Sequence, residues 1–211
     1  MKCCNLAAFD SSHQARGVSG LSNASRLDRE LWEDFQTDPE QTAFDAEKAY
    51  SEAMGTAPRV SDVVEWEEVQ GLDRTQMTKV RVNQQFFRAM ILTGYRSQCA
   101  ICEIPVASLL VASHIVPWSV DRSLRMNPRN GLCLCNLHDR AFDRGLITIN
   151  GDYRIVVDSS LQELRNIESI ATSFLKYEAQ ALRLPERWLP DPAFLDVHAN
   201  LAREQLSRCT S

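Results

Sequence analysis

Two pairs of metal-binding side chains constrain this chain more than any other feature of its sequence. Cys99 and Cys102 stand in the stretch CAIC, and Cys135 and His138 repeat the same two-residue gap after 32 intervening residues. Together the pairs can offer four ligands to one tetrahedral zinc ion. Cys133 is an alternative fourth ligand, because residues two apart on a strand share a face. The spacing therefore predicts a structural zinc site.

Cysteine usage favours a reducing compartment, and hydropathy argues against a membrane span and a signal peptide. The 211 residues include seven Cys, which in such a chain indicates thiols kept for metal or packing rather than a disulfide framework. No window approaches the 18 apolar residues of a transmembrane span, and the first ten residues are too polar for a signal peptide. We therefore expect a cytoplasmic protein that does not enter a membrane.

Charge is distributed unevenly along the chain. Residues 1–73 carry 6 Lys/Arg and 15 Asp/Glu, whereas residues 74–158 carry 11 Lys/Arg and 6 Asp/Glu. Most of the basic residues in the second segment are Arg, whose planar fork suits phosphate. A basic segment inside an acidic chain is a weak indication of a polyanionic partner, and a solvated surface explains charge alone equally well.

Turn and capping residues divide the chain into helices and short strands. Asp38-Pro39 is typical of a helix start and Gly55 of a helix end, while Asn150-Gly151 is typical of a hairpin turn. The helices predicted in this way cover 25–35, 39–54, 83–95, 138–143 and 192–208. The predicted strands cover 109–113 and 132–135, followed by a hairpin over 146–158.

Three further residues near the zinc ligands suit hydrolytic chemistry. Asp139 and Asp143 are four residues apart on a predicted helix, so both carboxylates point the same way. Two oxygen ligands on one face suit magnesium or manganese. His114 ends the first predicted strand, and a neutral imidazole there could deprotonate a water molecule.

The motifs around these residues resemble those of HNH endonucleases. Three of them occur in order, as ASHIVPW (112–118), NGL (130–132) and HDRAFDRGL (138–146), and the preceding stretch VNQQFFRAMILTGY (82–95) matches the usual approach helix. The resemblance covers residues 81–158. It implies an α+β fold: a ββα-metal nuclease core with a following β-hairpin, flanked by N-terminal and C-terminal helices.

The resemblance also implies an activity and a set of site residues. The chain is expected to be a metal-dependent DNA endonuclease, a phosphodiester hydrolase in which His114 activates water and Asn130 orients the ribbon. Asp139 and Asp143 are expected to hold one catalytic divalent ion, Mg²⁺ or Mn²⁺, with Zn²⁺ or Ni²⁺ as alternatives. Ser113 stands where relatives commonly have an Asp or His ligand, and a hydroxyl is a poorer ligand.

The role of His138 has two interpretations. Aligned by its letters, His138 is the last histidine of the HNH pattern and would bind the catalytic ion. Counted from Asn130, the catalytic ligand is Asp139, and His138 falls where zinc-bearing relatives have a Cys. We favour His138 on the structural zinc and Asp139 on the catalytic ion.

The predicted organisation has three parts. Residues 1–73 form an acidic, mainly helical region, residues 74–158 form the nuclease domain, and residues 159–211 form a helical extension that packs on the core. The segment GLSNASRLDRELWEDF (20–35) resembles the leader of stand-alone bacterial members that carry an upstream module, so this chain is expected to be a short or truncated version.

The expected partner is DNA, with a homodimer or a larger defence complex as further assemblies and restriction or defence as the role. Basic side chains in the nuclease segment are candidate phosphate contacts: Arg122, Arg125, Arg129, Arg140 and Arg144. The alternative function is a zinc-stabilised nucleic-acid-binding module on the same scaffold, without cleavage. Ser113 favours that alternative, whereas His114 and the paired aspartates favour cleavage.

Overall fold

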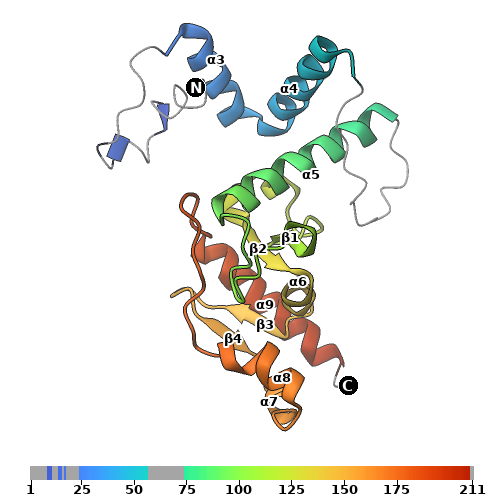
Figure 1. Ribbon diagram of the computed structural model, residues 1–211, viewed down its shortest axis with the longest axis vertical. Coiled ribbons are helices and arrows are strands. Elements are labelled where there is room, and N and C mark those ends of the chain that lie inside the picture. The colour runs from blue at the N-terminus through green and yellow to red at the C-terminus, as the bar shows by residue number, and fades with distance from the viewer. Residues whose placement is uncertain (1–8, 11–13, 16, 18–23, 57–73, 210–211) are drawn as a thin grey trace. The chain divides into compact units, whose positions relative to one another are not determined.

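The computed structural model describes residues 9–10, 14–15, 17, 24–56 and 74–209 (Figure 1). The chain divides into two compact units, Met1–Phe86 and Phe87–Ser211. The three-part division by function stays a prediction, because compactness does not test which segment carries an activity. None of the helices in the described ranges combines the length and apolar character needed to cross a bilayer.

The first unit contains helices α3 (Arg26–Thr37) and α4 (Pro39–Met54), which contact each other. The Ser25 side chain accepts a hydrogen bond from the backbone of Asp28, whose carboxylate accepts one from the Ser25 backbone, so the two form a capping box. The Asp38 side chain accepts a hydrogen bond from the Gln41 amide and so caps α4, and Gly55 ends this helix in the left-handed conformation, with φ at 63°. The predicted caps are confirmed.

Helix α5 (Arg74–Gly94) runs through the boundary between the two units. The prediction that this helix begins at Asn83 was wrong, because Asn83 lies in its interior. The residues before Asn83 include Arg, Gln, Met and Lys, which are good helix formers, so the helix continues through the less favourable asparagine.

The second unit is built around an antiparallel ribbon of β1 (Leu110–His114) and β2 (Gly131–Cys135), followed by α6 (Asn136–Asp143). In the register of the ribbon His114 pairs with Gly131, and α6 contacts both strands. A second antiparallel pair follows, made by β3 (Ile147–Ile149) and β4 (Ile155–Val157). The α+β class, the ββα order and the hairpin are thereby confirmed.

The C-terminal part of this unit is helical. Its helices are α7 (Ser159–Glu163), α8 (Glu168–Ser173) and α9 (Pro192–Cys209), and α9 contacts β3. Short 3₁₀ turns cover Ala107–Leu109, Arg122–Leu124, Pro128–Asn130 and Leu175–Tyr177. Gly145 follows α6 with φ at 71°, and an added Cβ there would lie 2.8 Å from the Cβ of Ala202, so α9 packs closely against the end of α6.

Buried apolar side chains connect these elements into one core. Every residue of β2 is buried, and Phe142 of α6, Ile149 of β3, Ile155 of β4 and Leu195 of α9 are 1% exposed or less. The ribbon, the hairpin and two helices therefore share the apolar interior of the second unit, and this interior fixes the ends of β1 and β2 on which the predicted site residues lie.

Candidate functional site

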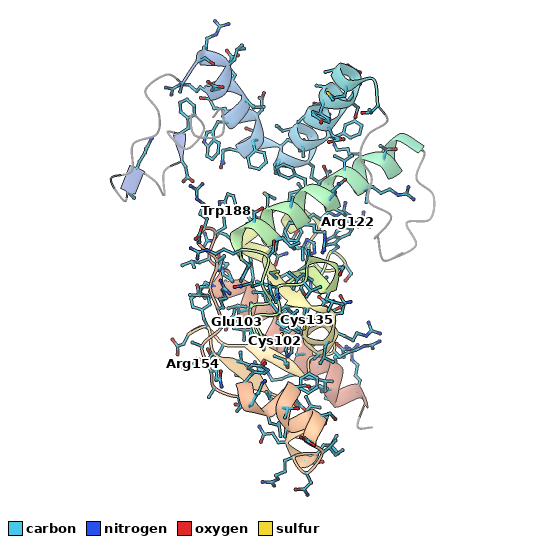
Figure 2. The ribbon with its side chains drawn as sticks, viewed as in Figure 1. Cys102, Glu103, Arg122, Cys135, Arg154 and Trp188 are labelled. Atoms are coloured by element: carbon cyan, nitrogen blue, oxygen red, sulfur yellow. The ribbon has the colours of Figure 1, made fainter. Side chains whose placement is uncertain are left out.

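The four predicted zinc ligands come together at one end of the ribbon. Cys99 and Cys102 lie in the turn after α5, Cys135 ends β2, and His138 lies in the first turn of α6. One ligand atom from each of the four residues lies within 4.8 Å of the other three. Cys99, Cys135 and His138 are buried, while Cys102 is half-buried, and Figure 2 labels Cys102 beside Cys135.

The distances within this group match those of a tetrahedral zinc site. Bonds of about 2.3 Å to sulfur and about 2.05 Å to nitrogen separate two sulfur ligands by about 3.8 Å, and a sulfur from a nitrogen by about 3.6 Å. The Sγ atoms of Cys102 and Cys135 are 3.7 Å apart, and Nδ1 of His138 is 3.6 Å from Cys99 Sγ and 3.2 Å from Cys135 Sγ. The donor set therefore fits this ion without rearrangement of the backbone.

Backbone hydrogen bonds hold the first cysteine pair against the ribbon. The Cys99 amide donates to the Ile104 carbonyl at 3.1 Å, and the Glu103 amide donates back to the Cys99 carbonyl at 3.0 Å. The Ala100 amide donates to the Cys133 carbonyl in β2 at 2.7 Å. The turn is therefore positioned by the strand that carries the third ligand.

The two nitrogens of His138 have separate partners. Nδ1 faces the thiols of Cys99 and Cys135, and Nε2 lies 2.9 Å from the carbonyl oxygen of Ser173. A histidine that binds metal through one nitrogen usually donates its other N–H to such a carbonyl, which fixes the tautomer. Of the two interpretations of His138, this geometry fits the structural zinc, because no nitrogen is left for a second ion.

The thiols of the site differ in acidity. Hydrogen bonds from Cys102 and from Cys135 hold the pKa of Cys99 well below its usual value, which favours the thiolate that metal binding needs. Cys133 is not part of the four-residue group, and burial raises the pKa of its thiol to about 12. The alternative of Cys133 as fourth ligand therefore has less support than His138.

His114 lies between two aromatic rings and a backbone carbonyl. Its ring stacks on Phe87 of α5, with centroids 4.1 Å apart and planes 10° apart, and Trp118 meets it edge-on at 5.4 Å. Its Nε2 lies 3.0 Å from the carbonyl oxygen of Arg125. Burial is the main cause that lowers the pKa of His114 to about 4; the contact with the Arg125 carbonyl raises the pKa and the positive charge of Arg125 lowers it, and the imidazole is neutral at pH 7.

Asn130 closes the loop between the two strands. Its side chain accepts a hydrogen bond from the Val116 amide at 2.8 Å and donates to the Val116 carbonyl at 3.1 Å and to the Leu124 carbonyl at 3.4 Å. Its backbone carbonyl accepts from the Ile115 amide at 3.0 Å. Asn130 is fully buried, so these bonds hold the segment that follows His114 against the start of β2.

The residues predicted for the catalytic ion are less closely grouped. Asp139 is buried and Asp143 exposed on α6, and the Ser113 hydroxyl is buried without a hydrogen-bond partner in the described part of the chain. Within the same part, the Cys/His group is the only set of three or more His, Cys, Asp or Glu residues close enough to share an ion. His114, Asp139 and Asp143 therefore do not form a comparable cluster.

The predicted phosphate contacts lie in different environments. Four of the five arginines are exposed: Arg122, Arg129, Arg140 and Arg144. Arg129 forms an ion pair with Asp191 at 3.0 Å, whereas the half-buried Arg125 places its guanidinium over the Trp118 ring, 5.0 Å from the centroid. Figure 2 labels Arg122. Their contact with DNA stays a prediction.

Three residues of the site were not singled out by sequence reasoning. Phe87 of α5 and Trp118 both contact His114. Arg88 was not considered, although its guanidinium donates to the carbonyls of Leu110 at 2.6 Å and of Ala107 at 3.0 Å and so joins α5 to the start of β1. Single residues in a helix or loop carry no spacing signal for such contacts.

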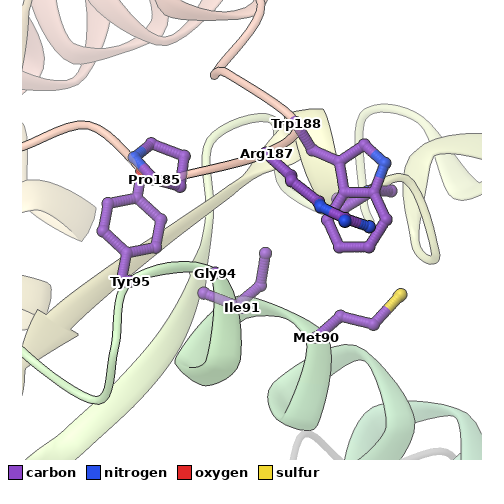
Figure 3. Close-up of a pocket in the computed structure, with 8 residues that line it drawn as sticks. Met90, Ile91, Gly94, Tyr95, Pro185, Arg187 and Trp188 are labelled. Atoms are coloured by element: carbon purple, nitrogen blue, oxygen red, sulfur yellow. The ribbon is translucent and has the colours of Figure 1, made fainter. Parts of the chain in front are cut away.

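A small hollow lies apart from these residues (Figure 3). Its volume is about 10 Å³, which is room for one water molecule rather than for a nucleotide. Met90, Ile91 and Gly94 of α5 form one side, and Arg187 and Trp188 form the other. The hollow is therefore too small to admit a substrate the size of a nucleotide.

Comparison with known proteins identifies the family of the central segment. The family model described as HNH endonuclease matches residues 99–150, about a quarter of the chain. The match begins at the first zinc-ligand candidate and ends at the turn of the hairpin. No curated protein matches the chain. Residues 99–150 of this chain are therefore similar to the HNH endonuclease family.

Proposed function

We propose that this chain is a metal-dependent DNA endonuclease that hydrolyses phosphodiester bonds. The observation that carries the proposal is His114, a neutral histidine at the end of β1 within the segment that matches the nuclease family. Its Nδ1 has no hydrogen-bond partner among the described residues, which leaves this nitrogen available to a water molecule.

His114 acts as the general base in this proposal. With the proton of the imidazole on Nε2 and donated to the Arg125 carbonyl, Nδ1 is free to take a proton from the attacking water. The Phe87 ring stacked on one face prevents the imidazole from rotating away. Asn130 is a positioning residue, because its hydrogen bonds to Val116 and Leu124 hold the loop that follows His114.

Two metal ions have different roles in the proposal. Zinc held by Cys99, Cys102, Cys135 and His138 stabilises the fold, since the four residues join the turn after α5 to β2 and α6. A catalytic ion would be held by Asp139 and Asp143, with the unpartnered hydroxyl of Ser113 as a further ligand. Such an ion stabilises the negative charge that develops on the scissile phosphate.

The substrate follows from the family and from the charge of the surface. Four exposed arginines in the matched segment supply positive charge that suits the phosphate backbone. We infer that DNA is the substrate, that restriction or defence in the cytoplasm is the role, and that the assembly is a homodimer or a larger defence complex. Family analogy supports these inferences.

One observation favours a second function. Only the zinc-ligand group forms a compact metal site in the described ranges, and the hydroxyl of Ser113 replaces a stronger ligand. The alternative is a zinc-stabilised module that binds nucleic acid without cutting it. Binding without cleavage by zinc-loaded protein would support this alternative.

Plasmid cleavage by the purified chain tests the proposal. Supercoiled DNA is incubated with Mg²⁺, Mn²⁺ or excess chelator, and His114→Gln is compared with the wild type. We expect nicked or linear product only with added metal, and a loss of about 10²–10⁴-fold in rate for the variant. Zinc content and affinity for DNA measured on both proteins show that the variant is folded. Metal-dependent cleavage that persists in His114→Gln would overturn the role of His114.

A further inference from the structure

Two groups compete for one nitrogen of His114. The Arg125 carbonyl oxygen lies 3.0 Å from Nε2, and the indole Nε1 of Trp118 lies 3.1 Å from the same atom. A carbonyl oxygen only accepts hydrogen bonds, and an indole N–H only donates them. The two contacts therefore require opposite protonation states of Nε2.

Each contact corresponds to one tautomer of the neutral ring. If Nε2 carries the proton, it donates to Arg125 and leaves Nδ1 as a free base. If Nε2 is bare, it accepts from Trp118, and the proton lies on Nδ1, which then cannot accept a proton from water. Nδ1 is thus a base in only one of the two forms.

We propose that Trp118 is a positioning residue that holds His114 in the tautomer protonated at Nδ1 until the substrate arrives. The proposal rests on the proposed function, because it matters only if Nδ1 of His114 is the base. By donating its hydrogen bond to Nε2, Trp118 keeps the proton on Nδ1, and Nδ1 then cannot act as the base. When this hydrogen bond breaks, solvent takes the proton from Nδ1 and returns one to Nε2 without change of net charge, and the Nε2–H then donates a hydrogen bond to the Arg125 carbonyl.

The contacts of Trp118 provide a way to break this hydrogen bond. The guanidinium of Arg125 lies over the indole ring at 5.0 Å, and its Nε is buried without a hydrogen-bond partner among the described residues. A phosphate of the DNA backbone is the acceptor that such a guanidinium pairs with most strongly. Pairing with phosphate draws Arg125 off the ring, which removes the contact that holds Trp118 against His114. The base is thereby released where a phosphate is bound.

Nitrogen NMR of the histidine side chains tests this inference directly. The full, zinc-loaded chain is labelled with ¹⁵N-histidine and measured at pH 7.5, and the His114 signals are assigned by their loss in His114→Gln. We expect a protonated, pyrrole-type Nδ1 in the wild type. Trp118→Phe keeps an aromatic ring but lacks the N–H, so we expect the tautomer ratio to shift by about tenfold toward a pyridine-type Nδ1. Trp188→Phe is the matched control and leaves the ratio unchanged.

DNA and a closer isostere complete the experiment. A short DNA duplex, added without Mg²⁺ or Mn²⁺ so that the zinc stays bound, should shift wild-type Nδ1 in the same direction as Trp118→Phe. Benzothienylalanine at position 118 replaces only the N–H by sulfur, so it gives the same shift even if the phenylalanine variant is unfolded. A pyridine-type Nδ1 in the wild type without DNA, or no shift in either variant, would overturn the inference.

The NMR experiment and the cleavage assay distinguish failure of this inference from failure of the proposed function. A shifted tautomer in a protein that never cuts DNA supports the hydrogen-bond assignment and contradicts the proposed nuclease. Metal-dependent cleavage that needs His114, together with an unshifted tautomer in Trp118→Phe, supports the nuclease and overturns the role of Trp118. If both proposals hold, Trp118→Phe cuts DNA at least as fast as the wild type.

Discussion

Gly131 lies opposite His114 in the ribbon, and replacing it with alanine is predicted to disturb the base through α5. An added Cβ would lie 2.8 Å from Cγ1 of Ile91 and 2.8 Å from Cζ of Phe87. Carbon atoms at their best separation are about 3.5–4.0 Å apart, so each side chain must move by about 1 Å. Ile91 and Phe87 are 3% and 2% exposed, which leaves no free space for that movement.

The expected cost of Gly131→Ala follows from overpacking. Forcing an additional methyl group into a well-packed core costs about 1–3 kcal/mol. Because Phe87 stacks on His114 at 4.1 Å, its displacement also moves the imidazole away from the Arg125 carbonyl. We therefore expect a free energy of unfolding lower by about 1–3 kcal/mol, and a slower cleavage rate at saturating DNA.

Urea unfolding in the presence of excess zinc measures this effect. Gly151→Ala is the matched control, because nothing lies within 4 Å of a Cβ added at this turn residue. The control should unfold at the wild-type urea concentration. A Gly131→Ala protein that is as stable as Gly151→Ala, and equally active, would refute the close packing of α5 on the ribbon and the link from that packing to His114.

Two further predictions concern the zinc group and acid stability. Cys135→Ala should lose the bound zinc, and its second unit should unfold. Cys133→Ala, which lies two residues earlier on the same strand, should keep one zinc per chain in a metal assay. Retention of zinc by Cys135→Ala would exclude Cys135 as a ligand. His198 stacks on Phe142 with centroids 3.6 Å apart, and burial lowers its pKa to about 4, so the unfolded chain binds more protons than the folded chain between about pH 6.5 and 4. The free energy of unfolding should therefore fall as the pH drops through this window, with His198 contributing about 2 kcal/mol of the loss at pH 5. Urea unfolding at several pH values measures this effect. A urea midpoint of His198→Phe that falls with pH as steeply as that of the wild type would contradict this.

Much of the fold could be predicted because its signals are local. Asp38-Pro39, Gly55 and Asn150-Gly151 mark their helix ends and hairpin turn through backbone preferences that neighbouring residues alone decide. The start of α5 could not be predicted from Asn83 in this way. A good N-cap residue permits a helix to begin but does not require it, and here the residues before Asn83 are helical as well.

In the candidate site, too, the locally spaced features could be predicted from the sequence and the tertiary contacts could not. The zinc group was predictable because the two ligands of each pair are separated by only two residues. The place of His138 was open in the sequence, since its two interpretations differ by one residue in alignment. Its contacts with Cys99, Cys135 and the Ser173 carbonyl depend on α8, which lies about 30 residues further along the chain.

By itself, the sequence determined the ββα order, the hairpin, the four candidate zinc ligands and the histidine at the end of β1. These features depend on spacing and on local backbone preference, and both can be read directly from the sequence. Only the tertiary structure decided that Phe87 and Trp118 contact His114, and that Gly131 is the point where α5 meets the ribbon. Such contacts join segments with no fixed spacing, so they arise only when packing in three dimensions brings the segments within a few ångströms.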